Sequence, residues 1–187
     1  MNDATQIVRY SRPAIALHWL IALLIVIIAA LGLYMVDLPD AAPERELLFD
    51  WHRWLGVTAF VFILARMLWR TVRKPPALVA SMPRLQRLAA SATHFALYAL
   101  MVVGPLTGYL LTNRAGEAVK VFGWSLPPLI GEDAGQVKLF EGIHAYVNYA
   151  LIAIAVLHAL AAFKHHFIDR DETLARMVPR LRPKRSR

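Results

Sequence analysis

The chain has 187 residues, 58% of them apolar, and a formal net charge of +8. It contains no cysteine, which excludes disulfides, thiolate-ligated zinc, iron–sulfur clusters and covalently attached c-type haem. Its mean hydropathy of +0.45 is typical of an integral membrane protein and excludes an ordinary soluble domain.

Four apolar segments are long enough to cross a bilayer. They cover residues 13–36, 51–69, 88–112 and 139–163. We therefore predict an all-α, integral membrane four-helix bundle, in which the whole chain forms a single transmembrane domain with a polar, basic tail at residues 170–187. The first span is too long for the core of a signal peptide, so we expect it to be retained.

The basic residues are distributed unevenly between the two sides of the predicted bundle. Sixteen of the 21 Lys and Arg lie at the amino terminus, around the connection between the second and third spans, and after the fourth span. The positive-inside rule then predicts that both termini are cytoplasmic. This pattern assigns the basic tail to membrane topology and lipid headgroups, and argues against nucleic-acid binding.

The first two spans contain ionisable residues that are costly in a membrane and usually functional. His18 lies about one turn inside the cytoplasmic end of the first span, and His52 begins the second span near the outer face. Gly56 follows one turn later, where it leaves room for a flat macrocycle or for a close helix contact. Arg66 is fourteen residues after His52, so it shares that face and can pair with a haem propionate or extend to lipid headgroups.

The third and fourth spans contribute three more histidines. His94 lies about a turn and a half inside the third span. His144 and His158 share the fourth, and their fourteen-residue separation corresponds to about 21 Å of rise and about 40° less than four full turns. His165 and His166 emerge at the cytoplasmic surface, and we expect residues 169–182 after them to be helical.

Depth sorts these side chains into opposed sets. His52 and His144 lie near the outer face, whereas His158 lies level with both His18 and His94. Two histidines facing each other across a bundle suit the axial ligation of a b-type haem, so two levels predict two haem b groups. Iron with two histidine ligands has no open position, which favours electron transfer. Depth alone does not choose between His18 and His94, and a hydrogen-bonded core histidine is the alternative for each residue taken singly.

The order of these motifs resembles the prokaryotic cytochrome b561 family, whose founding activity is superoxide oxidase. The resemblance covers nearly the whole chain. It rests on Arg9-Tyr10-Ser11, His18-Trp19-Leu20, Trp51-His52, Gly56, Arg66, His94, Asn113-Arg114, the spacing of His144 and His158, and the ending from His165-His166 to Pro179-Arg180.

The family resemblance implies a multi-pass protein of the bacterial inner membrane and a division of roles among the histidines. His18 with His158, and His52 with His144, are then the axial pairs. Ubiquinone then binds on the cytoplasmic side, with His94 and His165 as candidate contacts.

We therefore expect a di-haem b cytochrome, a superoxide:ubiquinone oxidoreductase, that moves electrons from periplasmic superoxide to ubiquinone. The alternative is a cytochrome b subunit that relays electrons between a dehydrogenase or hydrogenase partner and the quinone pool, with the acidic outer face as its docking surface. A histidine-lined metal transporter and a structural anchor are rivals from other classes. The outer segments carry nine acidic and five basic residues, which opposes attraction of an anion overall. Arg53, Arg114 and Lys138 are the candidate donor-side residues that could form a local basic funnel.

Overall fold

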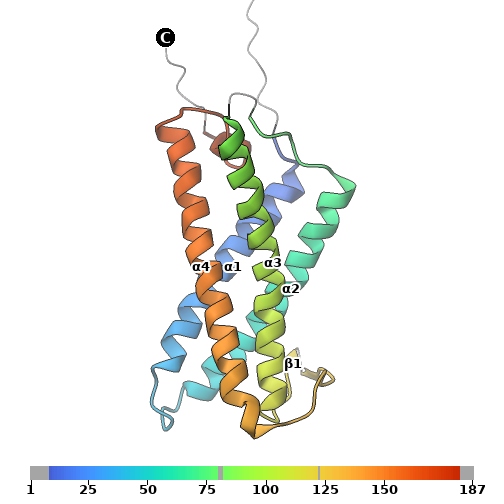
Figure 1. Ribbon diagram of the computed structural model, residues 1–187. Coiled ribbons are helices and arrows are strands. Elements are labelled where there is room, and N and C mark those ends of the chain that lie inside the picture. Colours follow the sequence, from blue (N-terminus) through green and yellow to red (C-terminus); the bar gives the residue numbers. More distant parts are fainter. Residues whose placement is uncertain (1–8, 80–81, 122, 182–187) are drawn as a thin grey trace, which may run out of the picture.

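The computed structural model describes residues 9–79, 82–121 and 123–181. Four long helices lie side by side along one axis (Figure 1). Each is long and apolar enough to cross a membrane, which confirms the predicted four-helix membrane bundle. The helices are α1 (Arg12–Val36), α2 (Arg45–Val72), α3 (Arg84–Arg114) and α4 (Val137–Phe167).

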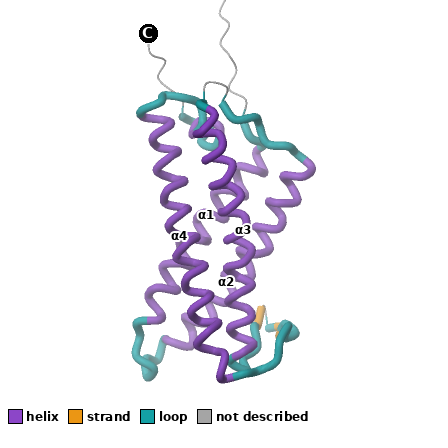
Figure 2. The backbone as a smooth tube through the Cα atoms, viewed as in Figure 1, coloured by secondary structure: helices purple, strands orange, loops and turns teal. Residues whose placement is uncertain are grey.

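The connections gather at the two ends of the bundle (Figure 2). We call the end where α1 begins and α4 finishes the terminal end; the α2–α3 connection also lies there. The α1–α2 and α3–α4 connections lie at the opposite, loop end. An even number of spans requires this arrangement, because each span returns the chain to the other side.

Three helices extend beyond the apolar segments that the sequence predicted. The helix α2 begins at Arg45 instead of residue 51, α3 begins at Arg84 instead of residue 88, and α4 continues to Phe167 instead of residue 163. Hydropathy detects only the part of a helix that lies in lipid. These added turns consist largely of Leu, Arg, Glu and Lys, which favour helix outside the apolar layer as well.

The α3–α4 connection contains a small hairpin that the sequence analysis did not anticipate. Its strands are β1 (Lys120–Val121) and β2 (Trp124–Ser125), which pair in antiparallel register. Gly123 in the turn has φ +83°, a conformation that favours glycine. Phe122, between the two strands, lies outside the described residues. The 3-10 helix η1 (Ala134–Gln136) then leads directly into α4.

The segment after α4 folds back against the bundle. Arg170 adopts φ 55°, and the chain reverses. The expectation of a helix over residues 169–182 is wrong, because the described part contains only the 3-10 helix η2 (Leu174–Arg176). An Asp171 carboxylate oxygen accepts a hydrogen bond from the Thr173 amide, which favours a turn over a helix at this point. The indole of Trp19 in α1 donates to the Met177 carbonyl at 3.0 Å, which anchors the returning chain. Residues 182–187 of the predicted basic tail lie outside the described residues.

The helices pack in two pairs. The helix α1 packs mainly on α2 and α3 mainly on α4, and the two pairs approach each other less closely. A small core of Ile21, Leu24, Ala59 and Ile63 joins α1 to α2. Many large apolar side chains are exposed, as expected for a surface that faces lipid. The histidines described next lie between the two helix pairs.

Candidate cofactor-binding site

At the loop end, His52 of α2 faces His144 of α4. Their ring centres lie 6.1 Å apart and their planes cross at 84°. At metal–imidazole bond lengths of about 2.0–2.1 Å, two rings bound on opposite sides of one ion have centres about 6 Å apart. The spacing of this pair therefore matches that of two axial ligands.

The hydrogen-bonding groups around His144 come from Thr107 and Asn148. The Thr107 hydroxyl donates to the Gly104 carbonyl at 2.7 Å, so its oxygen can accept a hydrogen bond from Nδ1 of His144, 3.0 Å away. The side-chain amide of Asn148 lies 3.2 Å from the same Nδ1 and 3.4 Å from Nε2. With the proton on Nδ1, Thr107 is its acceptor and the lone pair on Nε2 is the one that can bind a metal. Thr107 is buried, so its contact with His144 is shielded from water, and it has no signal in the sequence because the contact joins two helices.

Two glycines bring the helix backbone close to these rings. A Cβ built on Gly108 of α3 would lie 2.9 Å from Cε1 of His144, and one built on Gly32 of α1 would lie 3.0 Å from Cε1 of His52. Both imidazoles therefore pack against backbone where a side chain would clash. Nδ1 of His52 is buried and has no hydrogen-bond partner in the described part of the chain.

At the terminal end, three histidines from three helices come together. The ring centres of His18 and His158 lie 6.3 Å apart with planes crossing at 85°, closely matching the loop-end pair. His94 lies nearer to His158, at 5.3 Å and 65°. The separation that suits two ligands of one ion is thus found between His18 and His158, and the His94–His158 separation is shorter.

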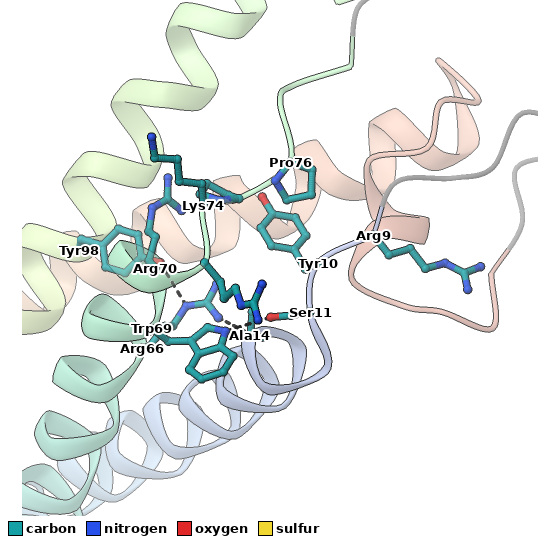
Figure 3. Close-up of a pocket in the computed structure, with 12 residues that line it drawn as sticks. Arg9, Tyr10, Ser11, Ala14, Arg66, Trp69, Arg70, Lys74, Pro76 and Tyr98 are labelled. Carbon is teal, nitrogen blue, oxygen red and sulfur yellow. Dashed lines mark hydrogen bonds between the residues drawn. The ribbon is translucent and has the colours of Figure 1, made fainter.

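Arg66 of α2 lies at the same end. Its Nε donates to the Tyr98 hydroxyl at 3.2 Å, and Nη1 donates to the Ala14 carbonyl (Figure 3). These two bonds use two of the five N–H donors of a guanidinium, so further donors are available to an anion. Arg66 therefore has donors left for a carboxylate or a lipid headgroup, and its pairing with a haem propionate stays a prediction.

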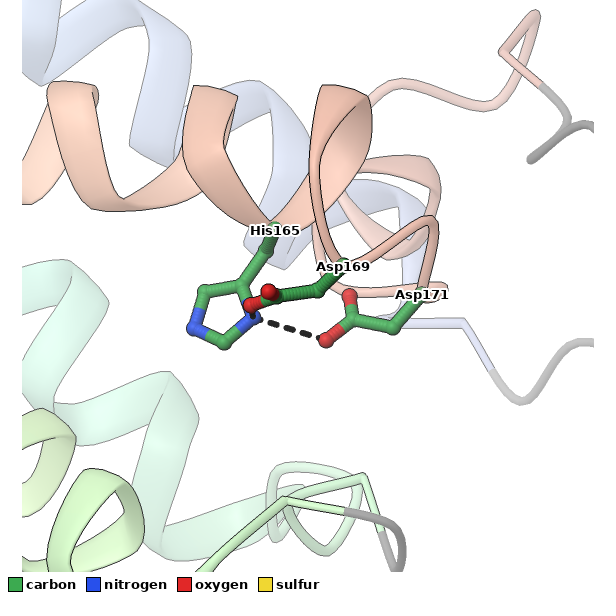
Figure 4. A group of neighbouring side chains, drawn as sticks. All are labelled: His165, Asp169 and Asp171. Atoms are coloured by element: carbon green, nitrogen blue, oxygen red, sulfur yellow. Dashed lines mark hydrogen bonds and ion pairs between the residues drawn. The ribbon is translucent and has the colours of Figure 1, made fainter.

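His165, at the end of α4, is held by two carboxylates. Its Nδ1 lies 2.7 Å from Oδ2 of Asp171 and 3.0 Å from Oδ2 of Asp169 (Figure 4). The Lys164 ammonium also contacts Asp169 at 2.6 Å, and this hydrogen bond lowers the pKa of the Asp169 carboxyl. Because the Lys164 ammonium already contacts Asp169, the two carboxylates of Asp169 and Asp171 are better suited to orient the His165 ring than to bind a metal ion. The i,i+4 spacing of His165 and Asp169 was the sequence signal for this contact.

The three candidate donor-side residues do not form one cluster of contacts. Arg53 pairs with Glu117 at 2.6 Å. Arg114 donates to the Gly131 carbonyl at 2.9 Å and lies over the Phe140 ring, whereas Lys138 is exposed. Across the described ranges, no hydrogen bond or ion pair joins the three residues to one another, and Glu117 already neutralises Arg53.

Residues 9–180 match the family described as prokaryotic cytochrome b561. The chain belongs to this family. Its relatives include cytochrome b561 homolog 2 of Escherichia coli K12, 37% identical over 177 residues that cover 91% of each chain. Cytochrome b561 homolog 1 of the same organism is 31% identical, covering 92% of this chain and 98% of its own. A probable superoxide oxidase of Yersinia pestis is 28% identical, covering 93% and 98%.

As a member of the prokaryotic cytochrome b561 family, this chain is a multi-pass bacterial membrane protein. It binds haem b and takes part in electron transfer. The residues present fit that group. Each matched histidine pair has the ring separation of two axial ligands, and Thr107 offers Nδ1 of His144 a hydrogen-bond acceptor. A Cβ on Gly56, one turn after His52, would meet no atom within 4 Å, so this side of α2 has open space.

Proposed function

We propose that the protein binds two haem b groups and moves electrons from a periplasmic donor to ubiquinone near the cytoplasmic side of the inner membrane. His52 with His144, and His18 with His158, are the proposed axial ligands. The strongest support is the geometry within each histidine pair. In both pairs the two rings are nearly perpendicular, and their centres lie 6.1 Å apart in one pair and 6.3 Å apart in the other. The two pairs are separated by fourteen residues of α4, or about 21 Å of rise.

Haem iron with two histidine ligands supplies one-electron transfer without an open position for oxygen. The chain contributes the four imidazoles and, in Thr107, an acceptor for Nδ1–H of His144, which favours the tautomer whose Nε2 can bind a metal. Arg66 contributes a guanidinium with unused donors, which we assign to a propionate carboxylate at the terminal end. The basic flanks of the bundle support the assignment of this end to the cytoplasm.

The proposed acceptor is ubiquinone, with His94 and His165 as its contacts. Reduction of one ubiquinone to ubiquinol takes up two electrons and two protons. An imidazole N–H can donate a hydrogen bond to a quinone carbonyl, and the contacts of His165 with Asp171 and Asp169 orient its ring. His94 is the third ring of the terminal end, and its shorter distance to His158 favours a role other than axial ligand.

The proposed donor is superoxide, two of which release two electrons and leave as two molecules of O2. The relative in Yersinia pestis whose name includes superoxide oxidase supports this donor. Arg53, Arg114 and Lys138 are the proposed residues of the approach path. The ion pair with Glu117 weakens the attraction of Arg53 for an anion, so Arg114 and Lys138 are the stronger candidates.

A cytochrome b subunit that serves a dehydrogenase or hydrogenase partner is the alternative. The acidic balance of the outer segments favours it, because such a surface suits docking of a basic partner more than attraction of an anion.

The decisive experiment uses the purified full-length chain. A pyridine haem assay should give two haem b per chain, and enzymatically generated superoxide should reduce added ubiquinone in a reaction that superoxide dismutase suppresses. A chain that stays colourless after expression with ample haem would contradict haem binding. A chain with two haems that does not respond to superoxide, and that co-purifies with a dehydrogenase, would favour the subunit function.

A further inference from the structure

A basic cavity lies at the terminal end, and no histidine is among the described residues that line it. It has a volume of about 320 Å³ and lies between the start of α1, the end of α2 with the residues that follow, and Tyr98 of α3 (Figure 3). None of the described residues that line it is acidic. Its cationic residues are Arg9, Arg66, Arg70, Arg73 and Lys74.

The cations of α2 and its continuation lack anionic partners. In the part of the chain that the structure describes, none of the five forms an ion pair with a carboxylate. Arg66 and Arg70 are four residues apart and share one side of α2, whereas Arg73 and Lys74 follow in the chain after α2 ends. Like charges gathered around one cavity repel one another unless an anion lies among them. In Figure 3, Arg9 points away from this group, and Arg66 is already assigned to a haem propionate, so Arg70, Arg73 and Lys74 are the cations available to a further anion.

The walls of the cavity are fixed by bonds of their own. The indole of Trp69 donates to Oγ of Ser11 at 2.9 Å, and the Arg70 guanidinium lies over the Tyr98 ring at 5.5 Å. Arg66 is bonded to the Tyr98 hydroxyl and to the Ala14 carbonyl. The cavity is therefore built before any ligand arrives, and Arg73 and Lys74 are exposed at its edge.

The surroundings of the cavity are those of a membrane interface. Leu68 and Val72, on the same last turns of α2, are exposed at 67% and 66%, so lipid-facing apolar surface reaches the level of the cavity, on the other side of the helix from Arg70. Trp69 and Tyr98 supply the aromatic side chains that favour the headgroup level. A ligand whose negative head lies at this level of the membrane matches the cavity.

We propose that this cavity binds the phosphate group of an anionic phospholipid. The arginines provide the planar donor pairs that match phosphate oxygens, and the acyl chains enter the lipid layer beside the bundle. A soluble phosphate offers the same oxygens but has no acyl chains to hold it at the membrane interface. This binding site is independent of the proposed electron donor and acceptor.

The test is a titration of phosphatidylglycerol into the delipidated full-length protein in detergent, read by native mass spectrometry. The unaltered chain should bind one phosphatidylglycerol in preference to phosphatidylcholine. The double variant Arg70→Gln/Arg73→Gln should bind it about tenfold more weakly or worse, since each surface cation contributes substantially to the attraction of anionic lipid. The variant Arg84→Gln/Arg87→Gln is the matched control, because it removes the same charge at the same end without altering the cavity lining.

Circular dichroism checks that each variant is folded. If the first double variant is unfolded, Lys74→Gln, which lies beyond the end of α2, should still weaken the lipid by a few-fold. Equal weakening by the control would show that the lipid senses only overall charge and would overturn the proposal. Inorganic phosphate that binds the unaltered chain as tightly as the lipid, with the same dependence on Arg70 and Arg73, would assign the cavity to a soluble anion and would also overturn it.

Discussion

The two ends of the bundle present the same pair of imidazoles in different surroundings. At the loop end, His144 is hydrogen-bonded to Thr107, and both rings pack on glycine backbone. At the terminal end, His158 has two histidine neighbours, and Arg66 lies at the same end. The first site is closely packed and uncharged, whereas the second offers an additional imidazole and positive charge. This difference suits a fixed ligand site at one end and exchange with a quinone at the other.

The largest expected effects come from removing one ligand at each end. The variant His158→Ala should reduce the haem content from two to one per chain and abolish electron flow to ubiquinone, because the terminal-end pair loses its α4 ligand. The matched variant His52→Ala should also leave one haem, now at the terminal end. A pyridine haem assay with a reduced spectrum measures both. Two haems retained in His158→Ala would refute the ligand assignment.

The next comparison separates the two neighbours of His158. The variant His18→Ala should lose the terminal-end haem, because the ring separation of 6.3 Å fits a shared ion. The variant His94→Ala should keep both haems but raise the KM for ubiquinone by about tenfold, the loss expected from one hydrogen bond of about 1.4 kcal/mol. Haem content and quinone kinetics are measured together. Loss of a haem in His94→Ala with retention in His18→Ala would exchange their roles.

Packing at the loop end can be tested with two glycines. The variant Gly108→Ala should displace His144, because the added Cβ would lie 2.9 Å from its ring. We expect partial loss of the loop-end haem and a decrease of about 1–3 kcal/mol in the free energy of unfolding. Gly142→Ala in α4 is the control, since its Cβ would meet no atom within 4 Å. Thermal unfolding and haem content should change only in the first variant.

The smallest effect should come from the hydrogen bond to His144. The variant Thr107→Val keeps the shape but removes the acceptor for Nδ1, so the loop-end haem should be retained about tenfold more weakly and show a shifted reduction potential. Thr107→Ser should restore both properties. Spectroscopic redox titration resolves the two haems, and the terminal-end haem should be unaffected. An equal shift of both haems would mean that Thr107 acts on the whole fold.

The sequence predicts the features of this molecule that depend on periodicity and on depth in the membrane. The four spans followed from apolar length, and the level of His52 with His144 followed from counting turns. The features that the sequence does not predict depend on contacts between segments far apart in the chain. Thr107 and Gly32 meet the histidines from other helices, and the return of residues 169–181 depends on the contact between Trp19 and Met177.

One continuous helix, α4, carries a proposed ligand for each site, and this makes its length a constrained quantity. Deleting a single residue between His144 and His158 would turn one ring by about 100° relative to the other. The two rings could then no longer both face the space between the helix pairs. Inserting seven residues would nearly restore the orientation but lengthen the path by about 10 Å. Point changes along the lipid-facing side of this stretch should therefore be tolerated, whereas any change in its residue count should not.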